Sequence, residues 1–484
     1  MSDNSRIREY RFFTRLIILL IFVVIGIYVA SSPMPQEGLE LLWVLPVLLG
    51  IAQFVFWKEV LYASNSFALI ILYATAVVRY VGTPLLIAVS GSLVPTINAG
   101  AGDYRVAIAI QAYELMLLGP IIRVVWPTHI RKLNTILNTN EDRVGASFHL
   151  TWTGGLFVVF LLMLLFGRGH INNVISHLST WFYRVNNKDI LYNYDMIAFN
   201  LLKTVLFLLL ISLIKKWYDR SRYKFLPFIF ALVIGLLNTM LYQYTERTDL
   251  FVLVFSTFYV LRFAFPKNTK FLTALFGVGG VLLVALIFME GSMQYTFGSS
   301  VQSVDLSNYE KMAQLYTTGP SILANAHMNY VVTRSEVNLL TIGKDFVSSF
   351  EFLSMLPFLR FMGKTVSSGL TTVELYVGSI GGLSYILPNY SLACLYVSDI
   401  FGWLLEAIFI VLTVKLAGHF ERSFYKYHNL AQIYAVINIV TMVSMGIFCN
   451  NFQLMIHGIT SLPFWLYIFA FVNELGTRVR LKTN

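Results

Sequence analysis

The feature that most constrains the fold is a series of apolar segments nearly twenty residues long, such as FTRLIILLIFVVIGIYVAS at positions 13–31. A helix needs about 20 apolar residues to cross the hydrocarbon core of a bilayer, whereas barrel strands are alternating segments of about 10 residues. The composition agrees, because only 12% of the residues are charged, against about 25% in soluble domains. The sequence therefore predicts an all-α polytopic membrane protein.

About twelve transmembrane helices are predicted, within a single integral membrane domain that covers residues 1–484. The first span follows several arginines but lacks a convincing cleavage site, so we expect a retained anchor and not a signal peptide. The predicted spans are 13–31, 39–56, 67–92, 107–126, 148–167, 197–214, 226–243, 248–265, 271–290, 391–414, 431–449 and 456–474.

The basic residues predict the orientation of these spans. An even number of spans puts both termini on one side of the membrane, and the loops on that side hold most of the loop Lys and Arg residues, including a cluster within 215–224. Cytoplasmic loops carry such an excess. Both termini are therefore expected in the cytoplasm. The net charge of +10 is explained by topology, and no nucleic-acid partner is predicted.

Residues 291–390 form a large extracytoplasmic loop under this orientation. The loop is rich in aromatic residues, as in SFEFLSMLPFLRFMGK, and its glycines and prolines would interrupt any long helix. It is too apolar for a solvated linker. We expect it to contain short or re-entrant helices at the outer face of the membrane.

Five charged residues of the predicted spans are singled out, because a charge at the bilayer centre costs about 2.5–3.5 kcal/mol on insertion scales. Arg79 and Glu114 lie in adjacent spans, so they either pair with each other or belong to a substrate pathway. Asp399 and Glu406 are seven residues apart and share one helix face, for either buried hydrogen bonding or proton coupling. Lys203 is the fifth.

Three cations on the predicted outer side are candidates for binding a phosphate. Arg247 opens an apolar run in YTERTDLFVLV, where it either pairs with Glu246 or Asp249 or binds a phosphate at a helix N-terminus. Arg360 and Lys364 are four residues apart in PFLRFMGK, where they either extend their side chains to the membrane surface or line the same pocket.

His327, in LANAHMNYV of the large loop, is a candidate general base, with ordinary hydrogen bonding as the alternative. The other histidines lack ligand spacing, and no phosphate-binding glycine loop or nucleophile elbow occurs, so neither a metal nor a cofactor is predicted. Cys394 and Cys449 are expected to be small buried residues.

The chain resembles the Wzy-type polymerases of polysaccharide repeat units, which are distantly akin to O-antigen ligases. The resemblance covers roughly residues 240–420 and rests on the number of spans, the large outer loop, and Arg247 at the start of a mid-chain helix. Two further stretches are similar to the segments that end the family's loop: FEFLSMLPFLR, and LPNYSLACLYVSDIFGWLLEAIFIVL with Gly402 in its helix.

This resemblance implies an enzyme that joins oligosaccharide repeat units, carried on undecaprenyl diphosphate, at the outer face of the bacterial cytoplasmic membrane. It implies that Arg247, Arg360 and Lys364, with Arg334 as a fourth, bind the diphosphate, and that His327 or Glu374 deprotonates the attacking hydroxyl. The lipid bilayer is a partner, together with flippase and chain-length regulator proteins. A lipid-linked oligosaccharide flippase or other transporter, an O-antigen-type ligase and a membrane scaffold are the competing interpretations.

Overall fold

The computed structural model is built of helices, which confirms the all-α prediction. Among the residues it describes, the β-structure is one isolated bridge, between Ser147 and Asn429. The described residues are 3–56, 66–93, 99–138, 147–167, 193–240, 247–279, 306–333, 343, 347, 349–350, 389, 393–394, 399–424, 429–449 and 452–483.

Six of the described helices are long and apolar enough to cross a membrane, which indicates a multi-pass membrane protein. Five shorter apolar helices lie in other predicted spans. The predicted span 271–290 lies largely outside the described residues, so the total of twelve stays a prediction. The six long candidates are Arg11–Ser31, Phe67–Ser90, Ala101–Leu133, Ala198–Arg220, Phe401–Ser423 and Met455–Gly476.

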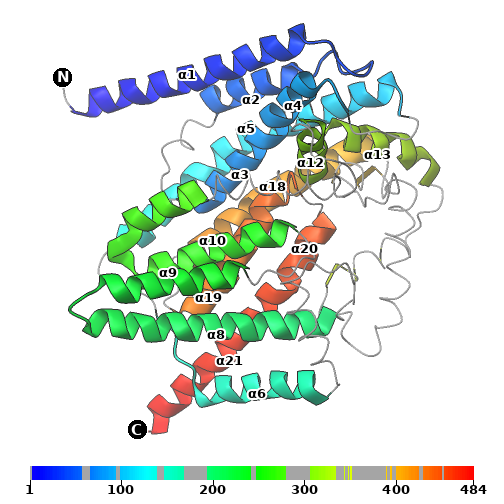
Figure 1. The fold of residues 1–484 in the computed structure, drawn as a ribbon. Helices are drawn as coiled ribbons and strands as arrows, with labels where there is room; N and C mark the ends of the chain where they lie inside the picture. The colour runs from blue at the N-terminus through cyan, green and yellow to red at the C-terminus, as the bar shows by residue number, and fades with distance from the viewer. Residues whose placement is uncertain are drawn as a thin grey trace, which may run out of the picture. The chain divides into compact units, whose positions relative to one another are not determined.

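The chain divides into two compact units, each assembled from segments far apart in the sequence (Figure 1). Unit 1 comprises Met1–Thr135, Gly279–Glu421 and Met442–His457. Its helices are α1 (Asp3–Ser31), α2 (Val44–Val55), α3 (Phe67–Val77), the π-helix η2 (Val78–Gly82), α4 (Thr83–Ser90), most of α5 (Ala101–Asn138), α12 (Leu306–Thr317), α13 (Pro320–Thr333) and most of α18 (Asp399–Phe424).

Glu421 joins three helices of unit 1 at one end of the unit. Its carboxylate accepts hydrogen bonds from the Ser66 hydroxyl (2.8 Å) and from the backbone N–H groups of Phe67 and Ala68, and so caps the N-terminus of α3. Its Oε2 also lies 2.8 Å from His129 Nε2 on α5. Because the first N–H groups of a helix have no partner inside it, this carboxylate satisfies donors that would otherwise be buried unpaired.

Unit 2 comprises Ile136–Val278, Arg422–Thr441 and Gly458–Asn484. Neighbouring helices of this unit lie side by side, as α8 with α9 and α6 with α21. Its helices are α6 (Trp152–Gly167), α8 (Asn193–Arg220), α9 (Phe225–Met240), α10 (Arg247–Ala264), the 3-10 helix η3 (Pro266–Asn268), most of α19 (Leu430–Met445) and α21 (Leu462–Thr483); α20 (Phe452–Thr460) begins in unit 1.

Two helices of unit 2 meet through a polar contact around Asn473 of α21. Its Oδ1 accepts a hydrogen bond from the Thr151 backbone N–H (2.8 Å), and its Nδ2 donates one to the His149 carbonyl (2.8 Å). A β-carbon added at Gly154 of α6 would stand 2.1 Å from the same Oδ1. The absence of a side chain at Gly154 therefore allows α6 and α21 to approach closely.

Candidate functional site

The residues predicted to bind the diphosphate fall largely outside the described part of the chain. Arg247 is the first residue of α10, in agreement with its predicted place at the start of a helix. Arg334, Arg360, Lys364 and the alternative base Glu374 lie outside the described residues. Their convergence on one pocket with Arg247 therefore stays a prediction.

The structure places His327 against an acidic residue that the sequence did not single out. His327 Nδ1 lies 2.9 Å from Asp103 Oδ1, and the two side chains are 29% and 21% exposed. A carboxylate beside one imidazole nitrogen fixes the orientation and the tautomer of the ring. This geometry is typical of a histidine that transfers protons through its other nitrogen.

Asp103 is held in place by the start of its own helix. It lies in the first turn of α5, where its Oδ2 accepts a hydrogen bond from the Gly100 backbone N–H (2.8 Å). Nearby on α5, Arg105 forms an exposed ion pair with Glu40 (3.6 Å). Under the predicted orientation, Glu40, Asp103 and His327 belong to three segments at or beside outer loops. Their proximity in unit 1 agrees with their predicted place on one side of the membrane, and which side that is stays a prediction.

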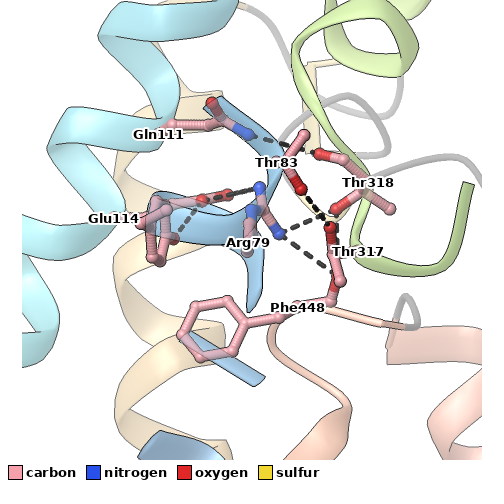
Figure 2. A network of polar contacts seen from close by, with 8 residues as sticks. Arg79, Thr83, Gln111, Glu114, Thr317, Thr318 and Phe448 are labelled. Atoms are coloured by element: carbon pink, nitrogen blue, oxygen red, sulfur yellow. Dashed lines mark hydrogen bonds and ion pairs between the residues drawn. The ribbon is translucent and has the colours of Figure 1, made fainter. Parts of the chain in front are cut away.

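A second polar cluster of unit 1 is centred on Arg79 (Figure 2). Arg79 Nη2 lies 2.7 Å from Glu114 Oε2, and the two side chains are 1% and 2% exposed, so the predicted pairing is confirmed. Arg79 Nη1 donates hydrogen bonds to Thr318 Oγ1 (2.7 Å) and to the Phe448 carbonyl (3.3 Å). The Tyr80 hydroxyl donates to Glu114 Oε2 (2.8 Å). A buried charge needs such partners to offset its desolvation.

The backbone on both sides of this cluster departs from regular helix. Arg79 lies in η2, which interrupts the candidate span Phe67–Ser90 near its middle. Across from it, Thr318 has φ +45°, a left-handed conformation that is uncommon for a β-branched residue. Single π-turns and strained residues of this kind are often found at functional sites.

Thr318 belongs to the turn between the short helices α12 and α13, which come from the segment predicted to be the outer loop. The turn is held on two sides: Gln111 Nε2 donates to the Thr318 carbonyl (3.5 Å), and the Thr83 and Thr317 hydroxyls are 3.4 Å apart (Figure 2). In Figure 1, α12 lies beside α4. The α12–α13 turn therefore reaches the part of the chain that lies in the middle of a candidate span.

Glu406, on α18, is the third charged residue of the cluster. It is 0% exposed, which agrees with the prediction that this helix face points inward. It is close enough to Arg79 and Glu114 to interact electrostatically with both. Neither of its carboxylate oxygens has a hydrogen-bond partner among the described residues. The structure therefore provides no support for the predicted hydrogen-bonding role of Glu406.

Three further predictions concern single residues. Cys394 and Cys449 are buried, as expected. Gly402, which the resemblance singled out, packs against Cys394: an added β-carbon would stand 2.5 Å from its Sγ. The side chain of Asp399 is not among those that the structure describes. The prediction that Asp399 and Glu406 share one face of the helix therefore stays a prediction.

The sequence did not identify the residues that His327 and Arg79 contact, apart from Glu114. The turn residues T-T-G-P at 317–320 were a signal for a helix break that could have located Thr318. Asp103 and the Phe448 carbonyl carried no such signal, because their roles depend on contacts across hundreds of residues. A search of family models, curated proteins and solved structures finds no match to this chain.

Proposed function

We propose that this chain is a membrane glycosyltransferase that polymerises oligosaccharide repeat units carried on undecaprenyl diphosphate. The reaction would take place at the outer face of a bacterial cytoplasmic membrane, with both termini in the cytoplasm. The product would be a surface polysaccharide of the O-antigen, capsule or exopolysaccharide type. The proposal rests on the resemblance of residues 240–420 to the Wzy-type family.

The structural observation that supports this proposal most directly is the contact between His327 and Asp103. Glycosyl transfer to a sugar hydroxyl requires a group that removes the hydroxyl proton. An imidazole oriented by a carboxylate is suited to this role, and the side chains of both residues are partly exposed. Both also belong to segments predicted to face outward, where lipid-linked repeat units would be joined.

The proposed reaction forms one C–O bond and breaks another. A hydroxyl at the non-reducing end of the incoming repeat unit loses its proton to His327 and attacks the anomeric carbon of the growing chain. The bond from that carbon to the diphosphate breaks, and undecaprenyl diphosphate leaves with the electron pair. Arg247, Arg334, Arg360 and Lys364 are proposed to stabilise the charge that develops on the diphosphate.

Sizing of reaction products tests this proposal. Purified protein in lipid nanodiscs is incubated with lipid-linked single repeats, and products are separated by length. Wild-type protein is expected to yield a ladder of polymers, whereas His327→Ala and Asp103→Asn leave mostly single repeats. Arg105→Gln is the matched control, because Arg105 lies on the same helix as Asp103 in an exposed ion pair. Single repeats left unjoined by folded wild-type protein would refute the proposal.

The buried Arg79, Glu114 and Glu406 favour one alternative, a flippase or other transporter of lipid-linked oligosaccharide. Ionisable residues inside a membrane often mark substrate or proton pathways. The two functions differ in what a deletion strain accumulates. Single lipid-linked repeats would accumulate on the outer face without a polymerase and on the inner face without a flippase. Accumulation on the outer face also fits a ligase, which the product ladder separates from a polymerase.

A further inference from the structure

Glu406 is an unusual carboxyl group even within a buried polar cluster. Its side chain is 0% exposed, and both of its oxygens lack a hydrogen-bond partner among the described residues. Glu114, by contrast, receives bonds from Arg79 and from the Tyr80 hydroxyl. Two carboxyl groups thus lie near one guanidinium, and the contacts of that guanidinium go to only one of them.

The charge balance of the cluster depends on the state of Glu406. With Glu406 ionised, one positive and two negative charges would be buried together, leaving a net charge of −1. With Glu406 protonated, the cluster is neutral. A buried carboxylate without hydrogen bonds is strongly disfavoured relative to its acid form, and a neighbouring carboxylate disfavours it further.

We infer that Glu406 is an intramembrane proton-binding site, and that its proton keeps Arg79 in contact with the α12–α13 turn. The ligand of this site is a proton. The inference does not depend on the proposed glycosyl transfer, because it concerns only the state of the Arg79 cluster. It assigns Glu406 to proton binding instead of to structural hydrogen bonding.

The coupling to the turn follows from how Arg79 distributes its donors. Nη2 contacts the Glu114 carboxylate, whereas Nη1 donates hydrogen bonds to two neutral acceptors, Thr318 Oγ1 and the Phe448 carbonyl. Nε has no hydrogen-bond partner among the described residues. An ionised Glu406 would attract the guanidinium more strongly than neutral acceptors do, because hydrogen bonds between ions are stronger than those to neutral groups. The contacts of Nη1 would therefore be lost first.

Loss of these contacts would act on a backbone that is already strained. Thr318 holds a left-handed conformation (φ +45°), and its hydroxyl both accepts from Arg79 and donates to the Phe448 carbonyl (3.1 Å). Strained residues persist only while surrounding contacts hold them. Deprotonation of Glu406 would therefore loosen α12 and α13, the second of which carries His327.

The surrounding titratable groups do not offer a better proton site. Among the described residues, those that interact electrostatically within the cluster are Arg79 and Tyr80 on η2, Tyr113 and Glu114 on α5, and Cys449. Arg79 keeps its proton throughout the accessible pH range. Glu114 accepts hydrogen bonds from Arg79 and Tyr80, which favour its carboxylate form over that of Glu406, and the hydroxyl and thiol groups are protonated near neutral pH.

Infrared difference spectroscopy of the full chain in nanodiscs tests the proton site. A protonated carboxylic acid has a C=O stretching band that a carboxylate lacks. We expect wild-type protein at neutral pH to show a band that is absent in Glu406→Gln. Glu406→Asp provides a second test, since the band should move to a different frequency instead of disappearing. Identical spectra of wild type and Glu406→Gln in this region would overturn the inference.

Amide hydrogen exchange of residues 306–333 tests the coupling. After correction for the intrinsic effect of pH, wild-type exchange in this segment should rise at least several-fold once the pH is high enough to remove the carboxylic acid band. Glu406→Gln, which mimics the protonated form, should stay protected over the same range, while the exposed variant Glu40→Gln should behave like wild type. Equal pH dependence in wild type and Glu406→Gln would overturn the coupling.

Neither measurement requires substrate, so the two proposals fail independently. If the carboxylic acid band of Glu406 is observed but the protein does not polymerise repeat units, the proposed function is refuted and the proton site stands. A polymerising chain without that band would refute the proton site alone.

Discussion

Arg79 and Glu114 form an ion pair of 2.7 Å in which both side chains are almost completely buried. The pair links η2 to α5, and through Thr318 it also holds the α12–α13 turn. Burying a charge is costly, so each member of such a pair depends on the other. The pair therefore holds η2, α5 and the α12–α13 turn together.

Removing one member of this pair should destabilise the protein more than removing both. Arg79→Met or Glu114→Met alone leaves an uncompensated buried group, at a cost of about 3–5 kcal/mol. The double variant Arg79→Met/Glu114→Met should recover a large part of that loss. The test compares the thermal unfolding midpoints of the wild type, the two single variants and the double variant in detergent. Additive losses in the double variant would show that the two residues act separately.

Two neighbouring glycines of α6 should respond to alanine in opposite directions. A β-carbon at Gly154 would collide with Asn473 Oδ1, whereas one at Gly155 would meet no atom within 4 Å. Overpacking typically costs about 1–3 kcal/mol, while glycine to alanine in an open helix position gains up to about 1 kcal/mol. Gly154→Ala should therefore lower the unfolding midpoint and Gly155→Ala leave it unchanged or raised. Equal midpoints would contradict the close packing of α6 and α21.

Glu421→Gln should loosen the start of α3. The carboxylate accepts hydrogen bonds from the Ser66 hydroxyl and from two backbone N–H groups, and it contacts His129. Hydrogen bonds to charged groups contribute about 1.5–3 kcal/mol, so a loss of that order is expected in thermal unfolding. Lys415→Gln, at an exposed position of the same helix, is the control. A midpoint equal to that of the control would argue against this capping role.

The exposed Glu40 should contribute a pH-dependent stability. A hydrogen bond from the Gly38 backbone N–H to Oε1 (2.9 Å) is the main reason that the pKa of Glu40 is lowered. A lowered folded-state pKa stabilises the fold above the unfolded-state pKa, and this contribution is lost as the pH falls through the folded-state pKa. Glu40→Gln should therefore have a slightly lower midpoint at neutral pH and no difference in strong acid. A difference that is constant with pH would contradict this assignment.

His327→Ala should slow polymer formation by about 10²- to 10⁴-fold, the usual contribution of a general base. Asp103→Asn should give a smaller loss, because the ring remains but its orientation and tautomer are no longer fixed by a carboxylate. Initial rates of repeat-unit joining, at matched amounts of folded protein, measure both effects. A His327→Ala rate equal to that of wild type would remove His327 from the mechanism.

The helices themselves were largely predictable. The apolar runs located α1, α3 to α5, α8 and α18 because hydrophobic length is a local property of the chain. The segment 291–390 was predicted to contain short helices, and its described part includes the short helices α12 and α13. What the sequence did not predict was how deeply these helices are buried. Gln314 and Ser321 are polar and yet fully buried, so local composition did not indicate the burial of these helices.

The candidate sites were likewise predictable only in part: the sequence identified several of their charged residues but not most of the contacts between them. The sequence singled out Arg79, Glu114 and Glu406, because a charge within an apolar run is costly wherever the run folds. It offered Arg79 and Glu114 as a pair, because they lie in adjacent spans, but it could not decide that Glu406 would lie beside them. That depended on which faces of α5 and α18 meet η2. The outcome was an Arg79–Glu114 contact beside a Glu406 that has no hydrogen-bond partner among the described residues.

By itself, the sequence determined that this protein is helical, that it resides in a membrane, and where its costly charges lie, since each of these follows from hydrophobicity summed over neighbouring residues. Only the tertiary structure decided that His327 meets Asp103 and that the α12–α13 turn reaches Arg79. These contacts join residues more than two hundred positions apart. Their formation depends on the packing of whole helices, a property that no local pattern of residues contains.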